Sequence, residues 1–173
     1  MKSITRIGSC LACASLLLAV PLLSGAYEVN VLRDVGSQWK NIENGQYETA
    51  IEILEERLKY NPAYRDVKLT NLCTAYLLVG KYNRATEVCD QAVEANGTFV
   101  TTAFNSRGVL NALKGDFLAA AADFDLAKKT HEDSMWSQLA HRDAIETNYQ
   151  SANHNMLALR VAAKSQLTAG VTK

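Results

Sequence analysis

Histidine and cysteine side chains are the groups in this chain that could bind a metal ion or act as nucleophiles. The three histidines, His131, His141 and His154, stand 10 and 13 residues apart. Two metal ligands on one helix face need a spacing of about four residues, so this spacing gives no zinc site. Cys73 and Cys89 fall at helical positions that we expect to be buried, where a thiol is inert. We therefore predict no metal site, no bound cofactor and no reactive thiol.

A second candidate for chemistry is the sequence His141-Arg142-Asp143, which Asn148 follows five residues later. Its spacing matches the catalytic loop of protein kinases. That loop works together with a glycine-rich loop, a paired lysine and glutamate and a metal-binding Asp-Phe-Gly motif. The sequence contains neither the glycine-rich motif nor Asp-Phe-Gly. We interpret the three residues as a polar helix face and predict that the protein is not an enzyme. An enzyme with an unrecognised motif remains a remote alternative.

The first 26 residues have the features of a secretory signal peptide. Lys2 and Arg6 give a positive start, residues 11–23 form an apolar run, and Ser24-Gly25-Ala26 supplies small residues. This order is typical of a signal that is cleaved, here after Ala26. The apolar run is shorter than the roughly 20 residues that a membrane-spanning helix needs. We predict a periplasmic or secreted protein that has no membrane attachment after cleavage.

The charge balance of the predicted mature chain does not indicate a strongly charged partner. The sequence has 18 Lys and Arg and 18 Asp and Glu residues, and removal of Lys2 and Arg6 leaves a net charge of −2. This balance gives no reason to expect nucleic acid or an anionic membrane surface as a partner. The length from Tyr27 to Lys173 suits one domain. Its two cysteines, Cys73 and Cys89, would lie in a compartment that permits disulfides.

A repeated pattern organises the middle of the chain. Glycines recur at a constant step of 35 residues, and each is followed by an aromatic residue and then by an alanine. Glycine ends a helix because it adopts the left-handed conformation, and alanine lets two helices approach closely. Each period therefore predicts two antiparallel helices joined by a short turn. The three columns are Gly45, Gly80 and Gly115; Tyr47, Tyr82 and Phe117; and Ala50, Ala85 and Ala120.

These columns resemble the tetratricopeptide repeat. The second period carries Asn71-Leu72-Cys73-x-x-Tyr76 and Gly80-Lys81-Tyr82, and the third carries Phe104-x-x-x-Gly108 and Gly115-Asp116-Phe117. The first period matches only in its second helix, because the helix expected around residues 31–43 is degenerate. The resemblance implies an all-α fold, a right-handed α-α superhelix in which neighbouring helix pairs stack.

The expected organisation follows from this register. A helical domain covers residues 27–167, with three antiparallel helix pairs at about 31–62, 66–97 and 101–132. A divergent C-terminal capping pair covers residues 134–167, with helices that begin near Ser134 and His154. Residues 168–173 form a loose tail.

The resemblance also implies a binding surface. In this family the first helices of successive pairs line a concave groove that takes a peptide or a partner's helix. Here the lining is apolar and neutral-polar and lacks the basic residues that bind acidic chain termini, so we expect an apolar or amphipathic protein segment as the ligand. Trp39 either anchors this ligand or packs the first pair. The lining residues are Trp39, Ile42, Thr70, Asn71, Thr74, Leu78, Asn105, Val109 and Leu113.

Cys73 and Cys89 fall on facing helices of one predicted pair. Counted outwards from the turn, their positions differ by about one helical turn, near 5 Å along the axis. This offset puts the Cα separation at or beyond the limit for a disulfide. A disulfide and two buried thiols both remain possible, and the counting favours the thiols. The role of the pair is structural in either case.

We therefore expect an exported scaffold or adaptor for protein–protein interaction, in a cell-envelope or secretion assembly. The alternative is a self-associating structural protein, a homodimer formed through the ends of the stack. A mass that depends on concentration would favour the homodimer.

Overall fold

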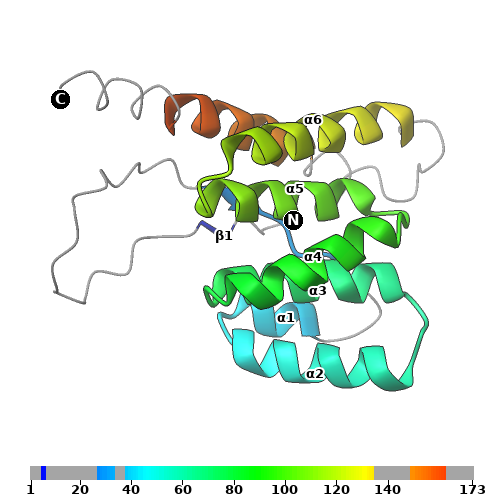
Figure 1. Ribbon diagram of the computed structural model, residues 1–173. Helices are drawn as coiled ribbons and strands as arrows, with labels where there is room; N and C mark the ends of the chain where they lie inside the picture. Colours follow the sequence, from blue (N-terminus) through cyan, green and yellow to red (C-terminus); the bar gives the residue numbers. More distant parts are fainter. Residues whose placement is uncertain (1–4, 7–26, 34–37, 135–148, 163–173) are drawn as a thin grey trace, which may run out of the picture.

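The computed structural model describes residues 5–6, 27–33, 38–134 and 149–162. Helices make up nearly all of this part, and they stack in sequence order as antiparallel pairs (Figure 1). The all-α fold and the sequential pairing predicted from the repeat are confirmed. The strands described are two short ones, β1 (Thr5–Arg6) and β2 (Glu28–Val29), which pair antiparallel.

Three helix pairs form the stack. The first pair consists of α1 (Gln38–Glu43) and α2 (Tyr47–Tyr60), and the second of α3 (Arg65–Leu78) and α4 (Tyr82–Glu94). The third consists of α5 (Val100–Leu113) and α6 (Phe117–Ser134), and a further helix covers residues 149–162. The first helices α3 and α5 also touch each other, so they form one inner layer.

The repeated columns explain how each pair closes. Gly80 follows α3 with a φ of 74°, a conformation that side-chain-bearing residues rarely adopt, and Gly45 and Gly115 do the same in their pairs. The alanines three residues beyond the aromatics have no exposed surface, so each lies where two helices approach. At Gly108 a Cβ atom would lie 2.5 Å from Cε1 of Phe124, so a side chain there would collide with that buried ring.

The first helix of the first pair is shorter than the sequence predicted. Residues 31–33 belong to no helix, and α1 begins only at Gln38. Residues 27–33, which we call segment 27–33, instead cross the inner layer of the stack, where β2 touches α5. The β-branched residues Val29 and Val31 favour this extended form, and both are buried in the main core cluster.

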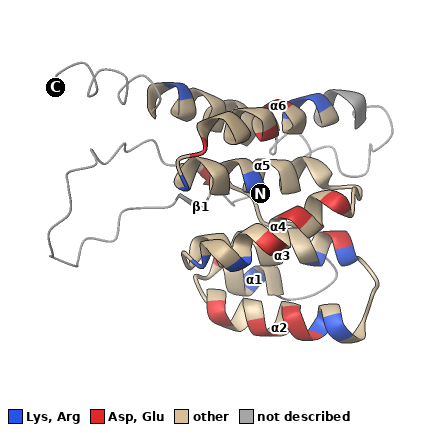
Figure 2. Ribbon diagram, in the orientation of Figure 1, with Lys and Arg blue, Asp and Glu red and all other residues tan. Residues whose placement is uncertain are grey.

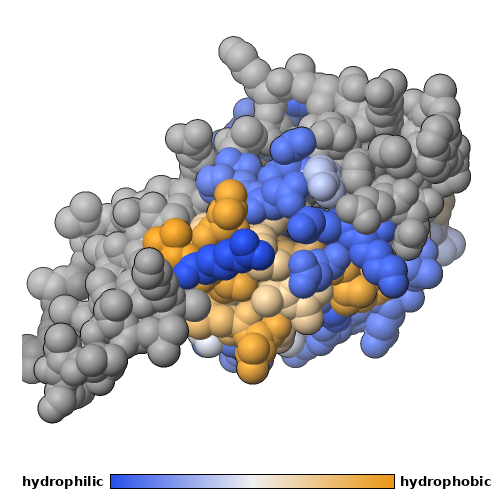
Figure 3. Space-filling model, turned by 90° about the horizontal axis from the view of Figure 1, so that it is seen from above, coloured by the Kyte–Doolittle hydropathy of each residue, from blue (hydrophilic) through white to orange (hydrophobic). Residues whose placement is uncertain are grey.

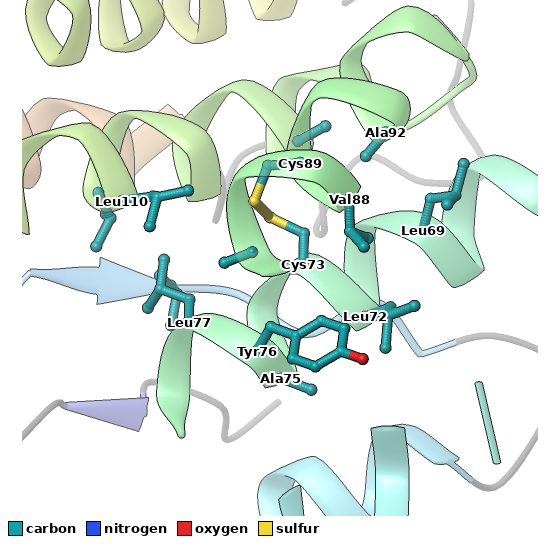
Figure 4. Close-up of a cluster of buried hydrophobic side chains, with 14 of the residues drawn as sticks. Leu69, Leu72, Cys73, Ala75, Tyr76, Leu77, Val88, Cys89, Ala92 and Leu110 are labelled. Atoms are coloured by element: carbon teal, nitrogen blue, oxygen red, sulfur yellow. A yellow bond between two sulfur atoms is a disulfide. The ribbon is translucent and has the colours of Figure 1, made fainter. Parts of the chain in front are cut away.

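A disulfide links Cys73 of α3 to Cys89 of α4, and both cysteines are fully buried (Figure 4). The Cα atoms are 4.9 Å apart, so the separation expected from the sequence was too large. Cys73 lies five residues before the end of α3 and Cys89 seven after the start of α4. The axial offset is therefore about 3 Å, at 1.5 Å per residue, rather than a full turn.

Several expectations fall on parts of the chain that the structure does not describe. They include residues 7–26 of the predicted signal peptide, the first helix of the capping pair after Ser134, and the tail at residues 168–173. α6 extends through Ser134, and the last described helix covers residues 149–162, which include His154. Within the described residues, no helix combines the length and the hydropathy needed to cross a bilayer.

Candidate functional site: the concave groove

The inner layer formed by α3, α5 and the helix at residues 149–162 holds segment 27–33 along its surface. This layer carries the predicted groove, so the groove is occupied by part of the same chain. Figure 1 shows the blue segment beside α5, and α3 is the neighbouring helix of the same layer. The contacts that hold the segment come from asparagine side chains of three different helices.

Asn71 on α3 holds one end of the segment. Its Nδ2 donates to the Leu32 carbonyl at 2.8 Å, and its Oδ1 accepts from the Leu32 N–H, also at 2.8 Å. Asn71 is fully buried and Leu32 nearly so. The two hydrogen bonds satisfy the backbone of Leu32, whose polar groups would otherwise be buried without partners.

Asn155 repeats this arrangement at the other end of the segment. Its Oδ1 accepts from the Glu28 N–H at 2.7 Å, and its Nδ2 donates to the Glu28 carbonyl at 2.7 Å. Asn105 on α5 donates to the same carbonyl at 3.1 Å, and its Oδ1 accepts from Asn155 Nδ2 at 3.0 Å. The three asparagines therefore bind the main chains of Glu28 and Leu32, and the Ser151 hydroxyl donates to Glu28 Oε2 at 3.4 Å.

The side chains of the segment complete its docking. Val29, Val31 and Leu32 are buried, and Val29 and Val31 belong to the same apolar cluster as Ile42 and Val109. Asn30 Nδ2 donates to the Ser151 hydroxyl at 3.0 Å. Burial of apolar side chains therefore adds to the hydrogen bonds that the groove asparagines make.

The predicted lining residues fall into two groups. Trp39 and Leu78 pack against the core but remain partly exposed to solvent, and Leu113 is 37% exposed. The Arg33 guanidinium lies 5.0 Å from the centre of the Trp39 ring, so part of segment 27–33 contacts Trp39. The other six are buried: Ile42, Thr70, Asn71, Thr74, Asn105 and Val109.

Two of the buried lining residues use their hydroxyls within the helices. Thr70 Oγ1 donates to the Asp66 carbonyl of its own helix at 2.9 Å, and Thr74 Oγ1 lies 3.2 Å from Ser106 Oγ of α5. The sequence did not mark Ser151 or Asn155 as groove residues. The one available signal for Asn155 was that an asparagine replaces the alanine of the repeat column.

The basic residues nearest the groove are bound to other groups. Lys68 Nζ donates to the carbonyls of Asn61 and Ala63 at 2.8 and 2.6 Å. Arg107, the one charged residue of α5, points to α4 and α6, where it pairs with Asp90 and Asp123. Hydrogen bonds to Asp123 are the main reason that the pKa of Arg107 is raised. Figure 2 shows α5 as mostly tan, whereas α2 carries charges along its length.

No group of three His, Cys, Asp or Glu side chains in the described part of the chain could hold a metal ion. His141 and the neighbouring polar residues lie outside that part. The groove is therefore the site that the described geometry supports: a neutral layer of asparagine and threonine side chains with apolar residues between them, which binds a peptide backbone.

Comparison with known proteins finds a family that part of this site resembles. Residues 41–99 match the tetratricopeptide repeat family. The match runs from α1 through α4 and includes Asn71, Cys73 and Cys89. No curated protein and no solved structure matches the chain at a significant level. Tetratricopeptide repeats are scaffolds for protein–protein interaction and typically have no catalytic role, so the repeats imply a protein as the partner.

Replacing Asn71 with alanine should loosen segment 27–33. The N–H and C=O of Leu32 would lose their partners in a buried place, which costs about 2 kcal/mol of unfolding free energy. Urea denaturation followed by circular dichroism measures this loss. Trypsin should also cut after Arg33 faster than in the parent, because the segment leaves the groove more often.

Thr70→Ala is the matched control for this change. Thr70 is buried one residue away on the same helix, but its hydroxyl binds its own helix rather than the segment. Its cleavage rate after Arg33 should equal that of the parent. Equal rates in Asn71→Ala and Thr70→Ala would show that Asn71 does not hold the segment.

Proposed function

We propose that the protein is an exported adaptor that binds an apolar or amphipathic segment of a partner protein in its concave groove. The observation that carries this proposal is the hold of Asn71 on the Leu32 main chain, because the same two hydrogen bonds suit the main chain of a partner segment. The neutral lining, with Arg107 and Lys68 turned to other groups, supports a partner segment without acidic recognition residues.

Two observations support export to an oxidising compartment. Residues 1–26 have the composition of a secretory signal, with cleavage expected after Ala26. The pair Cys73 and Cys89 forms a disulfide in the structure, and disulfides persist mainly in secreted, periplasmic or otherwise oxidising surroundings. We place the adaptor in a cell-envelope or secretion assembly.

The test of the adaptor is a pull-down from a cell-envelope extract, followed by reconstitution with the purified partner. Leu78 and Leu113 lie at the edge of the groove and keep exposed surface, so Leu78→Arg/Leu113→Arg should remove binding without unfolding the protein. Leu157→Arg is the control, because Leu157 is 60% exposed on the last described helix.

The expected result is a specific protein that the parent and Leu157→Arg bind and that Leu78→Arg/Leu113→Arg does not. Circular dichroism must show that all three remain folded. Equal binding by all three proteins would contradict the groove as the binding surface.

A homodimer through the end of the stack is a second candidate, which one observation favours. Large apolar side chains remain exposed on α6 and on the helix at residues 149–162. Figure 3 looks onto this end of the molecule and shows hydrophobic residues gathered in its centre. Such patches often mark interaction surfaces. The residues are Leu118 (87% exposed), Leu126 (41%), Leu157 (60%) and Val161 (62%).

If this end forms a dimer, Leu118→Glu should abolish it, because the new carboxylate would be buried between two copies. Sedimentation over a hundredfold range of concentration measures the mass. Tyr60→Glu is the control, since Tyr60 is 71% exposed at the end of α2. A parent protein that stays monomeric throughout would contradict this candidate.

A further inference from the structure

We infer that segment 27–33 occupies the place of the partner, and that the partner inserts an extended strand rather than a helix. This inference rests on the proposed function, which it makes more specific. Its basis is the contact of one asparagine carboxamide with the N–H and the C=O of a single residue, at Leu32 and again at Glu28.

The geometry of these contacts excludes a helical ligand. In an α-helix the N–H and C=O of one residue point in opposite directions along the axis, and both are bonded within the helix. In an extended chain the two groups of one residue point to the same side, where one carboxamide meets both. Asn71 and Asn155 each make this pair of bonds, so each recognises an extended backbone.

The spacing of the two contacts gives the same result. Glu28 and Leu32 are four residues apart, which spans about 13 Å in an extended strand but about 6 Å in a helix. Asn105 and Asn71 lie on the neighbouring helices α5 and α3, and packed helices are about 8–10 Å apart. A strand reaches from one helix to the next within these four residues, whereas a helix falls short.

The side chains of the segment indicate the sequence of the partner. Val29, Val31 and Leu32 are buried in the groove, so the partner strand carries aliphatic, preferably β-branched, residues at these places. Asn30 meets Ser151, which favours a neutral polar residue between the two valines. The partner segment therefore spans at least five residues and resembles Glu28-Val-Asn-Val-Leu32 in its pattern.

Segment 27–33 then also controls the access of the partner to the groove. A segment that is tethered to its own groove acts at an effective concentration of the order of millimolar, so it competes strongly with a partner in solution. Severing the chain between the segment and α1 removes this advantage. The cut protein should bind a free strand at least tenfold more tightly than the uncut protein.

The experiment uses the full chain with a recognition sequence for a site-specific protease inserted between Arg33 and Gln38. A fluorescent peptide with the sequence of residues 27–33 is titrated against the protein before and after cutting, and its anisotropy reports binding. Circular dichroism of the uncut protein confirms that the insertion leaves the fold intact. Incubation in urea just below the unfolding transition allows the cut piece to exchange.

Two methylated peptides test the recognition of the backbone. Methylation of the Leu32 nitrogen removes the N–H that Asn71 accepts, and should weaken binding at least tenfold. Methylation of the Val31 nitrogen is the control, because Asn71 and Asn155 bond to Leu32 and Glu28 instead. The control peptide should bind more tightly than the peptide methylated at Leu32.

Tenfold tighter binding after cutting, together with the difference between the two methylated peptides, supports the inference. No exchange of the cut piece, or equal binding of the two methylated peptides, overturns it. The proposed function has a separate outcome. A partner that still depends on Leu78 and Leu113 while no exchange occurs would leave the adaptor in place and show that segment 27–33 is a permanent part of the core.

Discussion

Asp123→Ala should lower the unfolding free energy by about 3 kcal/mol. Asp123 is buried and accepts two-point hydrogen bonds from Arg107 Nε and Nη2, at 3.0 and 2.7 Å, and a third from Asn111 Nδ2 at 2.9 Å. Removing one partner of a buried ion pair costs about 3–5 kcal/mol, because the other charge loses its buried partner. The low end applies since Arg107 keeps its ion pair with Asp90, and 24% of its side-chain surface is exposed.

Asp90→Ala is the matched control for this ion pair. Asp90 also pairs with Arg107, at 3.0 Å, but its side chain is 50% exposed, so its loss should cost less than 1 kcal/mol. Urea denaturation of the two variants and the parent measures both effects. Similar losses in Asp123→Ala and Asp90→Ala would show that the buried pair does not join α5 to α6 as the structure indicates.

Reduction of the disulfide between Cys73 and Cys89 should cost about 3 kcal/mol as well. The bridge joins residues 16 apart, and closing a loop of this length removes about that much conformational free energy from the unfolded chain. Because the bridge is buried between α3 and α4, the reductant must act during urea denaturation. The midpoint of the parent should shift to lower urea when reductant is present.

Cys73→Ala/Cys89→Ala separates the bridge from other effects of the reductant. This variant should be less stable than the oxidised parent, and its midpoint should not change with reductant. A parent whose midpoint is equally insensitive would contradict the disulfide and restore the pair of buried thiols that the sequence also allowed.

The parts of the fold that the sequence predicted are those with a local physical cause. Gly45, Gly80 and Gly115 are needed where each pair turns, and Ala50 and Ala85 where two helices touch. A fixed period of such residues therefore identified the helix pairs without any knowledge of long-range contacts. The disulfide shows the limit of this counting, because an error of a few residues in the turn changed the expected Cα separation beyond the permitted range.

The occupant of the groove could not be predicted in the same way. Asn71 and Asn105 were identified as groove residues from the register of the repeat. Their hydrogen bonds reach Leu32 and Glu28, which are 39 and 77 residues away in the chain. No periodic pattern encodes a bond from a side chain to a distant main chain. The degenerate first helix was the nearest signal, since residues 31–33 are not helical although the repeat would place a helix there.

The asparagines of the concave groove hold an extended backbone, and this hold should protect the bonded amides from exchange with solvent. Hydrogen exchange of individual amides, followed by nuclear magnetic resonance in the full-length protein, tests it most directly. The Glu28 and Leu32 amides should exchange as slowly as those in the middle of α3, because Asn155 and Asn71 accept their hydrogen bonds in a buried place. Exchange of both amides at the rate of an unstructured peptide would show that the asparagines do not hold the segment.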